Sequence, residues 1–286
     1  MKIGVVGVGV VGGATAEVLK KAHEVYLYDR FKPEYSSETD LENLIINAEV
    51  IFVCVPTPMK VTGEIDYSSV HNSMEQISEE VYKRSINPSE KLITIRSTAV
   101  SGTTDSLSEK YPFRFAFNPE FLREKYAVED MRNTDRIIIG ANDERSMNQL
   151  QGVYKPLFPD AKYVIVSRKE AEMIKYAANV TLASQVMIAN EIHNICKAVG
   201  VDYDIIRKAI LLDERIGNNI DVPGPDGDFG FGGKCFPKDL KALIRIAQEN
   251  EYDPYLLQEV WRTNERVRKN KDWLNIKGAT SKNNYL

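Results

Sequence analysis

The sequence has the length and composition of an ordinary globular protein. Its 286 residues are 43% hydrophobic and 27% charged, with a formal net charge of −4. This composition excludes collagen, coiled coil and a largely disordered chain, and the slightly acidic balance argues against nucleic acid as a main partner. The length suffices for two modest domains, each with its own hydrophobic core.

Hydropathy and the positions of the cysteines and histidines further limit the class of protein. The sequence lacks an apolar run of the about 20 residues that span a bilayer, and its glycine-rich start differs from a signal peptide. Cys54, Cys196 and Cys235 are odd in number and far apart, which favours reduced thiols over a disulfide framework. We therefore expect a cytoplasmic protein with no membrane partner. The histidines lack metal-ligand spacing, so no metal is expected.

The first part of the chain predicts strands that alternate with helices. Helices are expected at Ala14–Lys21 and Tyr67–Tyr82, for example. The strand candidates are Lys2–Val6, Glu24–Tyr28, Val50–Val55, Leu92–Ile95, Arg114–Phe117 and Arg136–Ile139. Apolar strands separated by helices are typical of a parallel sheet buried on both faces. Right-handed crossovers then give a Rossmann-type, doubly wound α/β domain, which we assign to residues 1–168.

The second part is predicted to be helical throughout. Apolar residues repeat every three or four positions from Glu170 to Val199, which predicts one long central helix. Shorter helices are expected at 202–212, 238–250 and 254–271, with a functional loop at 213–234. We assign an all-helical domain to residues 169–276 and a flexible polar tail to 277–286. The central helix has more apolar face than a small domain covers, so we predict a homodimer built on it.

The first turn of the Rossmann domain carries a dinucleotide-binding motif, Gly7-Val8-Gly9-Val10-Val11-Gly12. Its first glycine permits a tight turn, its second lets a pyrophosphate approach the helix N-terminus, and its third lets helix and strand pack closely. Asp29 ends the second strand, where a carboxylate meets the ribose hydroxyls and repels a 2′-phosphate. The sequence therefore predicts NAD as the cofactor. Pro56 and Thr57 follow a later strand, at the same ligand-binding edge of the sheet.

The segment from Phe229 to Asp239, FGFGGKCFPKD, is the most informative part of the chain. Its glycines allow a substrate to pass close to the backbone, and a helix beginning near Cys235 favours the thiolate. Asp239 lies four residues on, on the same face of that helix. The alternative is a buried structural cysteine behind a flexible loop, and the surrounding glycine, lysine and aspartate count against it.

Two other pairs share this four-residue spacing. Glu120 and Glu124 lie in NPEFLRE, after the strand Arg114–Phe117, and Lys175 and Asn179 lie on the long helix. Charged residues at this spacing usually form a solvated helix face. Lys175 and Asn179 are stronger candidates for a functional site, because apolar or small residues surround them in the sequence.

The chain resembles the UDP-glucose/GDP-mannose 6-dehydrogenase family. The motifs that carry the resemblance occur in the family's order, and they are GVGVVG, VPTP, RST at Arg96–Thr98, NPEFLRE, EMIKYAANVTLA, DERIG and GFGGKCFPKD. The resemblance implies oxidation of the C6 alcohol of a nucleotide sugar to the carboxylate, with NAD used twice. UDP-glucose is the favoured substrate.

The resemblance also implies roles for individual residues. Cys235 would attack the aldehyde to give a thiohemiacetal and then a thioester, while Lys175 and Asn179 stabilise the oxyanion. Thr98 and Asp239 would hold or activate a water, and Glu124 would act as general base in thioester hydrolysis. Ser97 and Thr98 would border the cofactor, and Arg215 would reach into the neighbouring subunit's site. The other substrate-binding candidates are Glu120, Phe121, Leu122, Arg123, Phe231, Gly232 and Gly233.

The sequence departs from the family pattern in two places. We expect a short member that lacks the family's C-terminal nucleotide-binding domain, and the loop from DERIG to Cys235 is longer, through residues 222–227. Both departures concern how the substrate nucleotide is held. Two alternatives stay open. One is a single-step hydroxyacid-type dehydrogenase, which would need neither Cys235 nor Glu124, and the other is a subunit that is inactive without a partner chain.

Overall fold

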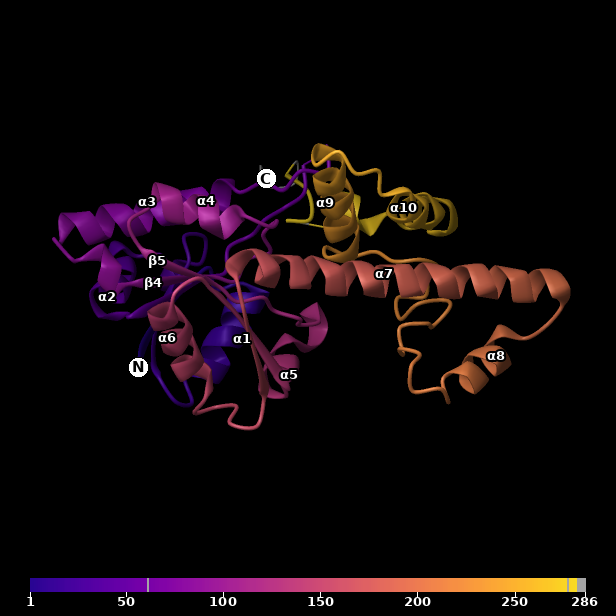
Figure 1. The fold of residues 1–286 in the computed structure, drawn as a ribbon, viewed down its shortest axis with the longest axis horizontal. Coiled ribbons are helices and arrows are strands. Elements are labelled where there is room, and N and C mark those ends of the chain that lie inside the picture. The colour runs from indigo at the N-terminus through magenta and orange to yellow at the C-terminus, as the bar shows by residue number, and fades with distance from the viewer. Residues whose placement is uncertain (61, 277, 282–286) are drawn as a thin grey trace. The chain divides into compact units, whose positions relative to one another are not determined.

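The computed structural model describes residues 1–60, 62–276 and 278–281, and it divides into two compact units (Figure 1). Unit 1 comprises residues 1–57 and 67–175, and unit 2 comprises residues 58–66 and the described chain from 176 onward. The units divide after residue 175, inside the long helix and seven residues beyond the predicted domain boundary. That boundary, after residue 168, stays a prediction. The predicted tail, 277–286, lies outside the described residues except for 278–281.

Unit 1 is built on a seven-stranded sheet with the strand order β2-β1-β3-β4-β5-β6-β7. Neighbouring strands are parallel except for β5 and β6, which are antiparallel. The strands are β1 (Lys2–Val6), β2 (Glu24–Tyr28), β3 (Val50–Val53), β4 (Leu92–Ile95), β5 (Arg114–Phe117), β6 (Arg136–Ala141) and β7 (Lys162–Val166). The central strands β3 and β4 are buried along their whole length, as expected for a sheet with both faces covered.

Helices cover both faces of this sheet (Figure 1). One layer contains α2 (Glu38–Asn47), α3 (Ser68–Lys83) and α4 (Thr103–Lys110), and the other contains α1 (Val10–Leu19), α5 (Ala127–Arg132) and α6 (Glu144–Tyr154). Side chains of β3 alternate between the layers: Val50 and Phe52 pack with α1, α5 and α6, whereas Ile51 and Val53 pack with α2, α3 and α4. The predicted doubly wound α/β fold is confirmed.

The sheet corrects the sequence prediction at one edge. Strand β7 is not among the predicted strands, because a short apolar run directly before a long helix can belong to either element. Strand β6 runs antiparallel to β5 rather than parallel, since an apolar pattern does not encode strand direction. Helix α1 begins four residues before its predicted start, because two adjacent glycines in its first turn obscure the helical pattern.

Unit 2 is mainly helical, as predicted. Its helices are α7 (Arg168–Val199, whose first residues belong to unit 1), α8 (Tyr203–Ile210), α9 (Phe236–Glu249) and α10 (Tyr255–Val267). A capping box starts α7, with hydrogen bonds from the Ser167 N–H to the Glu170 carboxylate at 2.8 Å and from the Glu170 N–H to the Ser167 hydroxyl at 3.3 Å. Gly200, with a φ of +77°, follows its last turn. None of the described helices is long and apolar enough to cross a membrane.

Short elements complete both units. Single 3₁₀ turns occur at η1 (Pro33–Tyr35), η2 (Pro88–Glu90), η3 (Glu124–Tyr126) and η4 (Asp272–Leu274). In unit 2, Met59 forms isolated bridges with Ile65 and Thr280, which ties the 58–66 segment to the end of the described chain. Two apolar clusters pack along α7, one with Leu240 of α9 and the other with Tyr203 of α8.

Candidate active site

The glycine turn after β1 has the three environments that dinucleotide binding requires. Gly7 has a φ of +87°, and a Cβ there would lie 2.8 Å from the carbonyl oxygen of Cys54. A Cβ on Gly12 would lie 1.9 Å from the carbonyl oxygen of Gly7, so helix and strand are in backbone contact. Gly9 is the N-cap of α1, and a Cβ on it would meet open space. A pyrophosphate therefore has room beside the helix N-terminus, next to Val10.

The Asp29 carboxylate connects the end of β2 to this turn. One oxygen accepts a hydrogen bond from the Val8 N–H at 2.7 Å, and the other accepts one from the Phe31 N–H at 2.9 Å. The side chain is partly exposed, which leaves it accessible to ribose hydroxyls. The open position at Gly9 and this carboxylate fit NAD, and Val11 in the first turn of α1 lies between the two outer glycines of the motif.

The ends of β3 and β4 carry the next candidates. The Ser97 hydroxyl donates to the carbonyl oxygen of Val55 at 2.7 Å, which ties the two strand ends together. Pro56 is exposed, Thr57 is buried and Thr98 is half-buried. These four predicted residues therefore lie at the carboxyl edge of neighbouring strands, as the sequence analysis expected of cofactor contacts.

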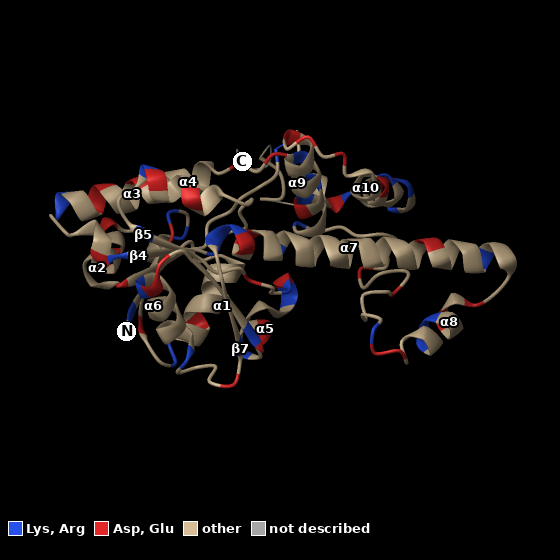
Figure 2. Cartoon of the chain, in the orientation of Figure 1, with Lys and Arg blue, Asp and Glu red and all other residues tan. Residues whose placement is uncertain are grey.

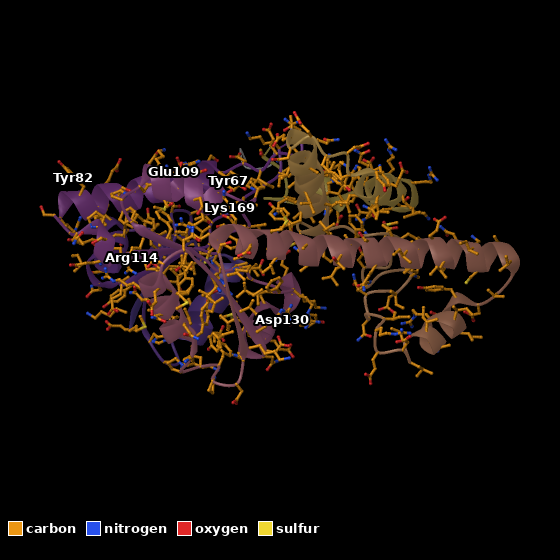
Figure 3. All side chains as sticks on the ribbon, in the orientation of Figure 1. Tyr67, Tyr82, Glu109, Arg114, Asp130 and Lys169 are labelled. Atoms are coloured by element: carbon orange, nitrogen blue, oxygen red, sulfur yellow. The ribbon has the colours of Figure 1, made fainter. Side chains whose placement is uncertain are left out.

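Two side chains hold the loop that follows β4. The Tyr67 hydroxyl accepts a hydrogen bond from the Val100 N–H at 2.7 Å (Figure 3). The buried Glu172 carboxylate accepts from the Gly102 N–H at 2.6 Å and from the Thr104 N–H at 2.7 Å. Glu172 lies in the second turn of α7, so the start of that helix and the loop after β4 are fixed to each other.

Glu120 and Lys175 form a buried ion pair in unit 1. The Lys175 ammonium donates to the Glu120 carbonyl oxygen at 2.6 Å and to its Oε1 at 2.9 Å, and the Leu122 N–H donates to Oε2 at 2.7 Å. Burial by itself raises the pKa of Glu120, but the Lys175 cation, the Leu122 N–H and the charge of Arg96 together bring that pKa below its usual range. The carboxylate is thus ionised at neutral pH and fixes the position of the Lys175 ammonium.

The residues after Glu120 differ in their surroundings. The Phe121 ring is half-buried, and its centroid lies 5.3 Å from the Lys175 ammonium. Arg123 is exposed and pairs with Asp130 of α5 at 2.6 Å (Figure 3). Glu124 is exposed at the start of η3. The predicted roles of these residues in substrate binding and hydrolysis stay predictions.

A second buried polar cluster lies in unit 2. The Asn179 amide donates to Oδ2 of Asp239 at 2.5 Å, and the Lys238 ammonium donates to Oδ1 of the same carboxylate. All three side chains are buried, and Lys238 was not among the predicted site residues. The Asp239 carboxylate therefore orients the Asn179 amide. Asn179 and Lys175 are one turn apart on α7, so their side chains leave the helix on the same face.

Cys235 is the N-cap of α9, which agrees with the expected helix start. Its thiol is exposed, whereas Cys54 and Cys196 are buried. Burial raises the pKa of Cys54 to about 12, as is typical of an inert thiol in an apolar core. Cys235 has the exposure and the neighbouring helix N-terminus that a reactive cysteine requires, and its role as nucleophile stays a prediction.

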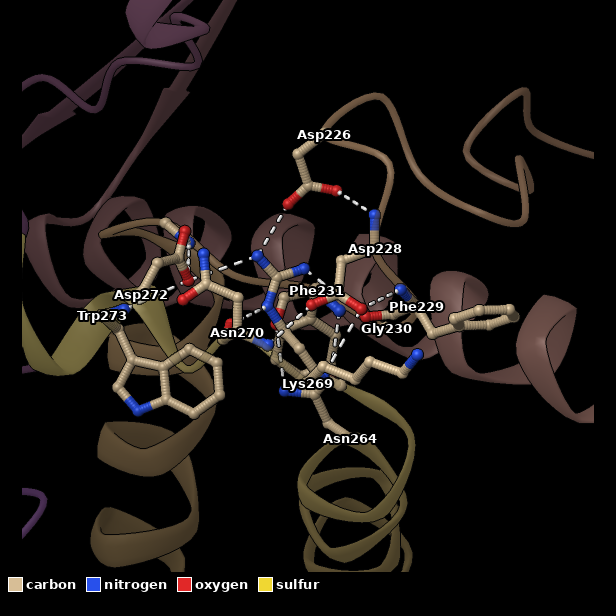
Figure 4. A network of polar contacts seen from close by, with 12 residues as sticks. Asp226, Asp228, Phe229, Gly230, Phe231, Asn264, Lys269, Asn270, Asp272 and Trp273 are labelled. Atoms are coloured by element: carbon tan, nitrogen blue, oxygen red, sulfur yellow. Dashed lines mark hydrogen bonds and ion pairs between the residues drawn. The ribbon is translucent and has the colours of Figure 1, made fainter.

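At two glycines of the FGFGG segment, side chains of unit 2 lie close to the backbone (Figure 4). A Cβ on Gly230 would lie 2.2 Å from the side-chain Oδ1 of Asn264, and a Cβ on Gly232 would lie 2.2 Å from a guanidinium nitrogen of Arg268. A Cβ on Gly233, in contrast, would meet open space. The close approach expected of a substrate is therefore compatible with Gly233, whereas at the other two glycines the chain's own side chains approach the backbone.

Two further predicted substrate residues have surroundings of a different kind. The Phe231 side chain is buried in the apolar cluster that contains Leu240 and Val260. The Arg215 guanidinium pairs with Asp213, and its side chain is 88% exposed. The roles assigned to Phe231 and Arg215 stay predictions.

The sequence analysis missed Glu172, Asn264, Arg268 and Asp272. A usable signal existed for Glu172, which precedes Lys175 by one helical turn and therefore shares its helix face. Asn264 lies inside a helix, and Arg268 and Asp272 are a charge pair at a four-residue spacing, a pattern that usually belongs to solvent-exposed surface. Only contacts with a segment distant in sequence distinguish them.

Comparison with known proteins matches both parts of the chain to one family. Residues 21–158 match the NAD binding domain of the UDP-glucose/GDP-mannose dehydrogenase family, and residues 169–266 match the central domain of the same family. The first match confirms NAD as the predicted cofactor.

Individual relatives agree with these matches. UDP-glucose 6-dehydrogenases from Rickettsia bellii and Rickettsia felis are 41% and 37% identical over 224 and 230 residues, covering 76% and 78% of this chain and 49% of each relative. The chain thus spans about half the length of the curated relatives it matches.

Solved structures extend the agreement to the fold. A UDP-glucose dehydrogenase from Pyrobaculum islandicum is 31% identical, with a TM-score of 0.81 over 93% of this chain and 68% of that one. A GDP-mannose dehydrogenase from Pseudomonas aeruginosa is 29% identical, with a TM-score of 0.67 over 93% and 69% of the two chains. With this sequence identity, this fold and both domain matches, the chain belongs to the UDP-glucose/GDP-mannose dehydrogenase family.

Proposed function

We propose that the chain oxidises the C6 alcohol of a nucleotide sugar to the carboxylate in two NAD-dependent steps, with Cys235 as the covalent nucleophile. The observation that carries the proposal is the exposed thiol at the N-terminus of α9, one helical turn from the buried Asp239–Asn179 pair. UDP-glucose is the favoured substrate, because the curated relatives are named UDP-glucose 6-dehydrogenases.

The cofactor would be held by the residues of the glycine turn and by Asp29. The Gly9 position leaves room for the pyrophosphate, and the Asp29 carboxylate accepts hydrogen bonds from ribose hydroxyls. Pro56, Thr57, Ser97 and Thr98 would border the nicotinamide end at the edge of the sheet. NAD, when bound, accepts a hydride from C6 in each of the two oxidations.

Cys235 would act between the two oxidations. Its thiolate attacks the aldehyde carbon, an S–C bond forms, and the carbonyl electron pair moves onto oxygen. The Lys175 ammonium, held by Glu120, and the Asn179 amide, held by Asp239, would stabilise that oxyanion. The resulting thiohemiacetal loses a hydride and a proton to become a thioester.

Water would then hydrolyse the thioester. Glu124 takes a proton from the attacking water, and Thr98 and Asp239 hold the water in place. The C–S bond breaks, the electron pair returns to sulfur as the Cys235 thiolate, and the carboxylate product is released. The segments Phe121–Arg123 and Phe231–Gly233 would border the substrate, with Arg215 acting in the neighbouring subunit.

We further propose that the chain functions as a cytoplasmic homodimer. Support comes from unit 2, where large apolar side chains are exposed along the C-terminal half of α7 and on α8. The nucleotide-sugar substrate is the other proposed partner.

The stoichiometry of NADH tests the proposal. Purified protein is mixed with NAD and a panel of UDP- and GDP-sugars, and NADH formed per sugar consumed is counted for the unchanged protein, for Cys235→Ser and for Cys196→Ala. Two NADH per sugar are expected, with turnover lost in Cys235→Ser and kept in Cys196→Ala, because Cys196 is buried in an apolar cluster.

Other outcomes would lead to other conclusions. One NADH per sugar that is unaffected by Cys235→Ser would replace the covalent mechanism with a single-step, hydroxyacid-type oxidation. NAD binding without turnover of any sugar would indicate a subunit that needs a partner chain.

A further inference from the structure

The loop that leads to Cys235, residues 226–233, is held by side chains from the end of unit 2 (Figure 4). We call this segment the cysteine loop. Besides hydrogen bonds within the loop, it has contacts with residues distant in sequence, on α7, on α10 and in the stretch from 268 to 272. The proposed mechanism assigns no role to these partners.

Arg268 is the centre of this arrangement. Its side chain is 1% exposed, and one guanidinium nitrogen lies 2.6 Å from the Asp226 carboxylate and 3.3 Å from the Asp272 carboxylate. The other nitrogens donate to the carbonyl oxygens of Asn270 at 2.7 Å and Phe229 at 3.4 Å. A buried guanidinium with this many acceptors fixes both ends of the cysteine loop relative to the end of α10.

Asp272 and Asn264 hold the backbone of the loop directly. The Asp272 carboxylate accepts from the Gly233 N–H with both oxygens, at 3.2 and 3.1 Å. The Asn264 amide pairs with both backbone groups of Phe231, accepting from its N–H at 2.8 Å and donating to its carbonyl oxygen at 3.0 Å. Gly232 is required here, because a Cβ would lie 2.3 Å from the Asp272 carboxylate.

We propose that Asp272, paired with Arg268, is a positioning residue that sets the orientation of the Cys235 thiol at the start of α9. The inference rests on the proposed nucleophilic role of Cys235. Residues 233–235 form the turn that enters α9, so fixing the Gly233 N–H fixes the turn from its first residue. The turn thereby places Cys235 at the N-cap of α9, where the helix dipole favours the thiolate.

The Arg268 cation explains how a carboxylate can serve this purpose. A lone carboxylate bound to the backbone two residues before Cys235 would disfavour the thiolate by like-charge repulsion. The Arg268 cation, which Asp272 shares with Asp226, offsets part of that charge while leaving the oxygens of Asp272 as acceptors for the Gly233 N–H. Asp226 pairs with the same guanidinium nitrogen from the start of the cysteine loop, which makes it a suitable control position.

Alkylation of Cys235 by iodoacetamide tests the inference without NAD or sugar. The thiolate displaces iodide and forms an S–C bond, and the product is quantified at Cys235 by peptide mass spectrometry over a range of pH. The variants are Asp272→Ala, Asp272→Asn, Arg268→Lys and Asp226→Asn, each with its melting temperature. Cys54 and Cys196 are buried and serve as internal references.

We expect Asp272→Ala to be alkylated roughly fivefold more slowly at neutral pH, with its rate profile moved to higher pH, the factor typical of a charge at a helix N-terminus. Asp272→Asn keeps an acceptor oxygen and should stay within about twofold of the unchanged protein. Asp226→Asn should match the unchanged protein. If Asp272→Ala does not fold, Arg268→Lys, which loses the planar fork, provides the same measurement.

Three results would overturn the inference. Equal alkylation rates for Asp272→Ala and the unchanged protein would remove the positioning role, and equal slowing in Asp226→Asn would indicate general loosening of the loop. Faster alkylation in both Asp272 variants would show that only the charge matters. Because the assay needs no turnover, a protein that forms no NADH but shows the expected alkylation pattern would contradict the proposed function and leave this inference standing.

Discussion

Single atoms decide the properties of the glycine turn. Gly12 and Gly9 are both glycines of one motif, yet a Cβ on the first would lie 1.9 Å from a carbonyl oxygen and a Cβ on the second would meet nothing within 4 Å. The fold therefore constrains the first position and leaves the second open, where the proposed site places the cofactor. Substituting each glycine separately distinguishes the two positions, which the motif alone does not distinguish.

We expect Gly12→Ala to destabilise unit 1 by about 3 kcal/mol, because backbone atoms must move to admit the methyl group. Gly9→Ala should leave stability nearly unchanged and weaken NAD binding, since its methyl group occupies the space assigned to the pyrophosphate. Urea unfolding and titration with NAD measure the two effects. Equal loss of stability in both variants would contradict the separation.

The Glu120–Lys175 pair shows how burial and charge oppose each other at one residue. Burial raises the pKa of Glu120, and the Lys175 cation together with the Leu122 N–H lowers it by more. The folded-state pKa is therefore below the unfolded value of about 4.3. A carboxyl with a depressed pKa stabilises the fold above its unfolded pKa, and that contribution is lost as the pH falls through the folded value.

Glu120→Gln should cost about 3 kcal/mol at pH 7, because it leaves a buried cation beside a neutral amide. The difference in unfolding free energy between the variant and the unchanged protein should begin to shrink below the unfolded pKa of about 4.3. It should be lost as the pH falls through the lower folded-state pKa, where Glu120 is protonated in the folded parent as well. Denaturant unfolding at several pH values measures this. A difference that stays constant from pH 7 to pH 3 would rule out the ionised pair as its source.

At the scale of elements, Glu172 joins helix α7 to the N-terminus of α4. Its carboxylate accepts three hydrogen bonds, from the N–H groups of Gly102 and Thr104 and from the Thr104 hydroxyl at 2.6 Å. The N–H groups at the start of a helix have no partners within the helix, so a buried carboxylate satisfies them and interacts favourably with the dipole. This contact also fixes the helix turn that carries Lys175.

Removal of the Glu172 carboxylate should be far more costly than removal of a capping carboxylate at the surface. Glu172→Ala leaves buried donors without an acceptor and is expected to cost about 3 kcal/mol. Glu170→Ala removes the exposed capping box of the same helix and should cost about 1 kcal/mol. Thermal unfolding of the two variants gives the comparison, and similar losses would show that Glu172 acts only as a local cap.

For the molecule as a whole, patterns local in sequence predicted the fold class and most element positions. Strand β4 is correct at both ends, and α7 begins two residues before its predicted start, because apolar repeats and glycine motifs act over a few residues. The antiparallel contact of β5 with β6 was not predictable in this way, since strand pairing joins distant segments. The contact of Arg268 with Asp226 was missed for the same reason.

The same distinction applies to the candidate site. The Lys175–Asn179 spacing indicated a shared helix face, but not that Glu120 and Asp239 each hold one of these side chains. Those partners are defined by tertiary packing. The motifs thus predicted the candidate reactive groups, and the structure supplies the hydrogen-bond partners that orient Lys175 and Asn179.

The exposed apolar face of unit 2 concerns the assembly of the whole molecule. The stretch of α7 between Lys175 and Glu191 carries no charge, and appears as a tan segment in Figure 2. In the C-terminal half of the helix, Ile188, Ile195 and Val199 are 60%, 54% and 68% exposed, and their spacing places them on one face. A row of apolar side chains of this kind is typical of a surface that a second copy covers.

We therefore expect a dimer at micromolar concentration that Ile195→Glu disrupts. Because a two-fold interface contains each residue twice, one substitution introduces two unpaired charges and should raise the dissociation constant by about 100-fold or more. Tyr82→Glu is the matched control, since Tyr82 is 88% exposed on α3 of unit 1 (Figure 3). Sedimentation velocity of the three proteins distinguishes the outcomes. A monomeric unchanged protein would remove the predicted dimer and with it the assignment of Arg215 to a neighbouring site, whereas a dimer insensitive to Ile195→Glu would place the interface on a different surface.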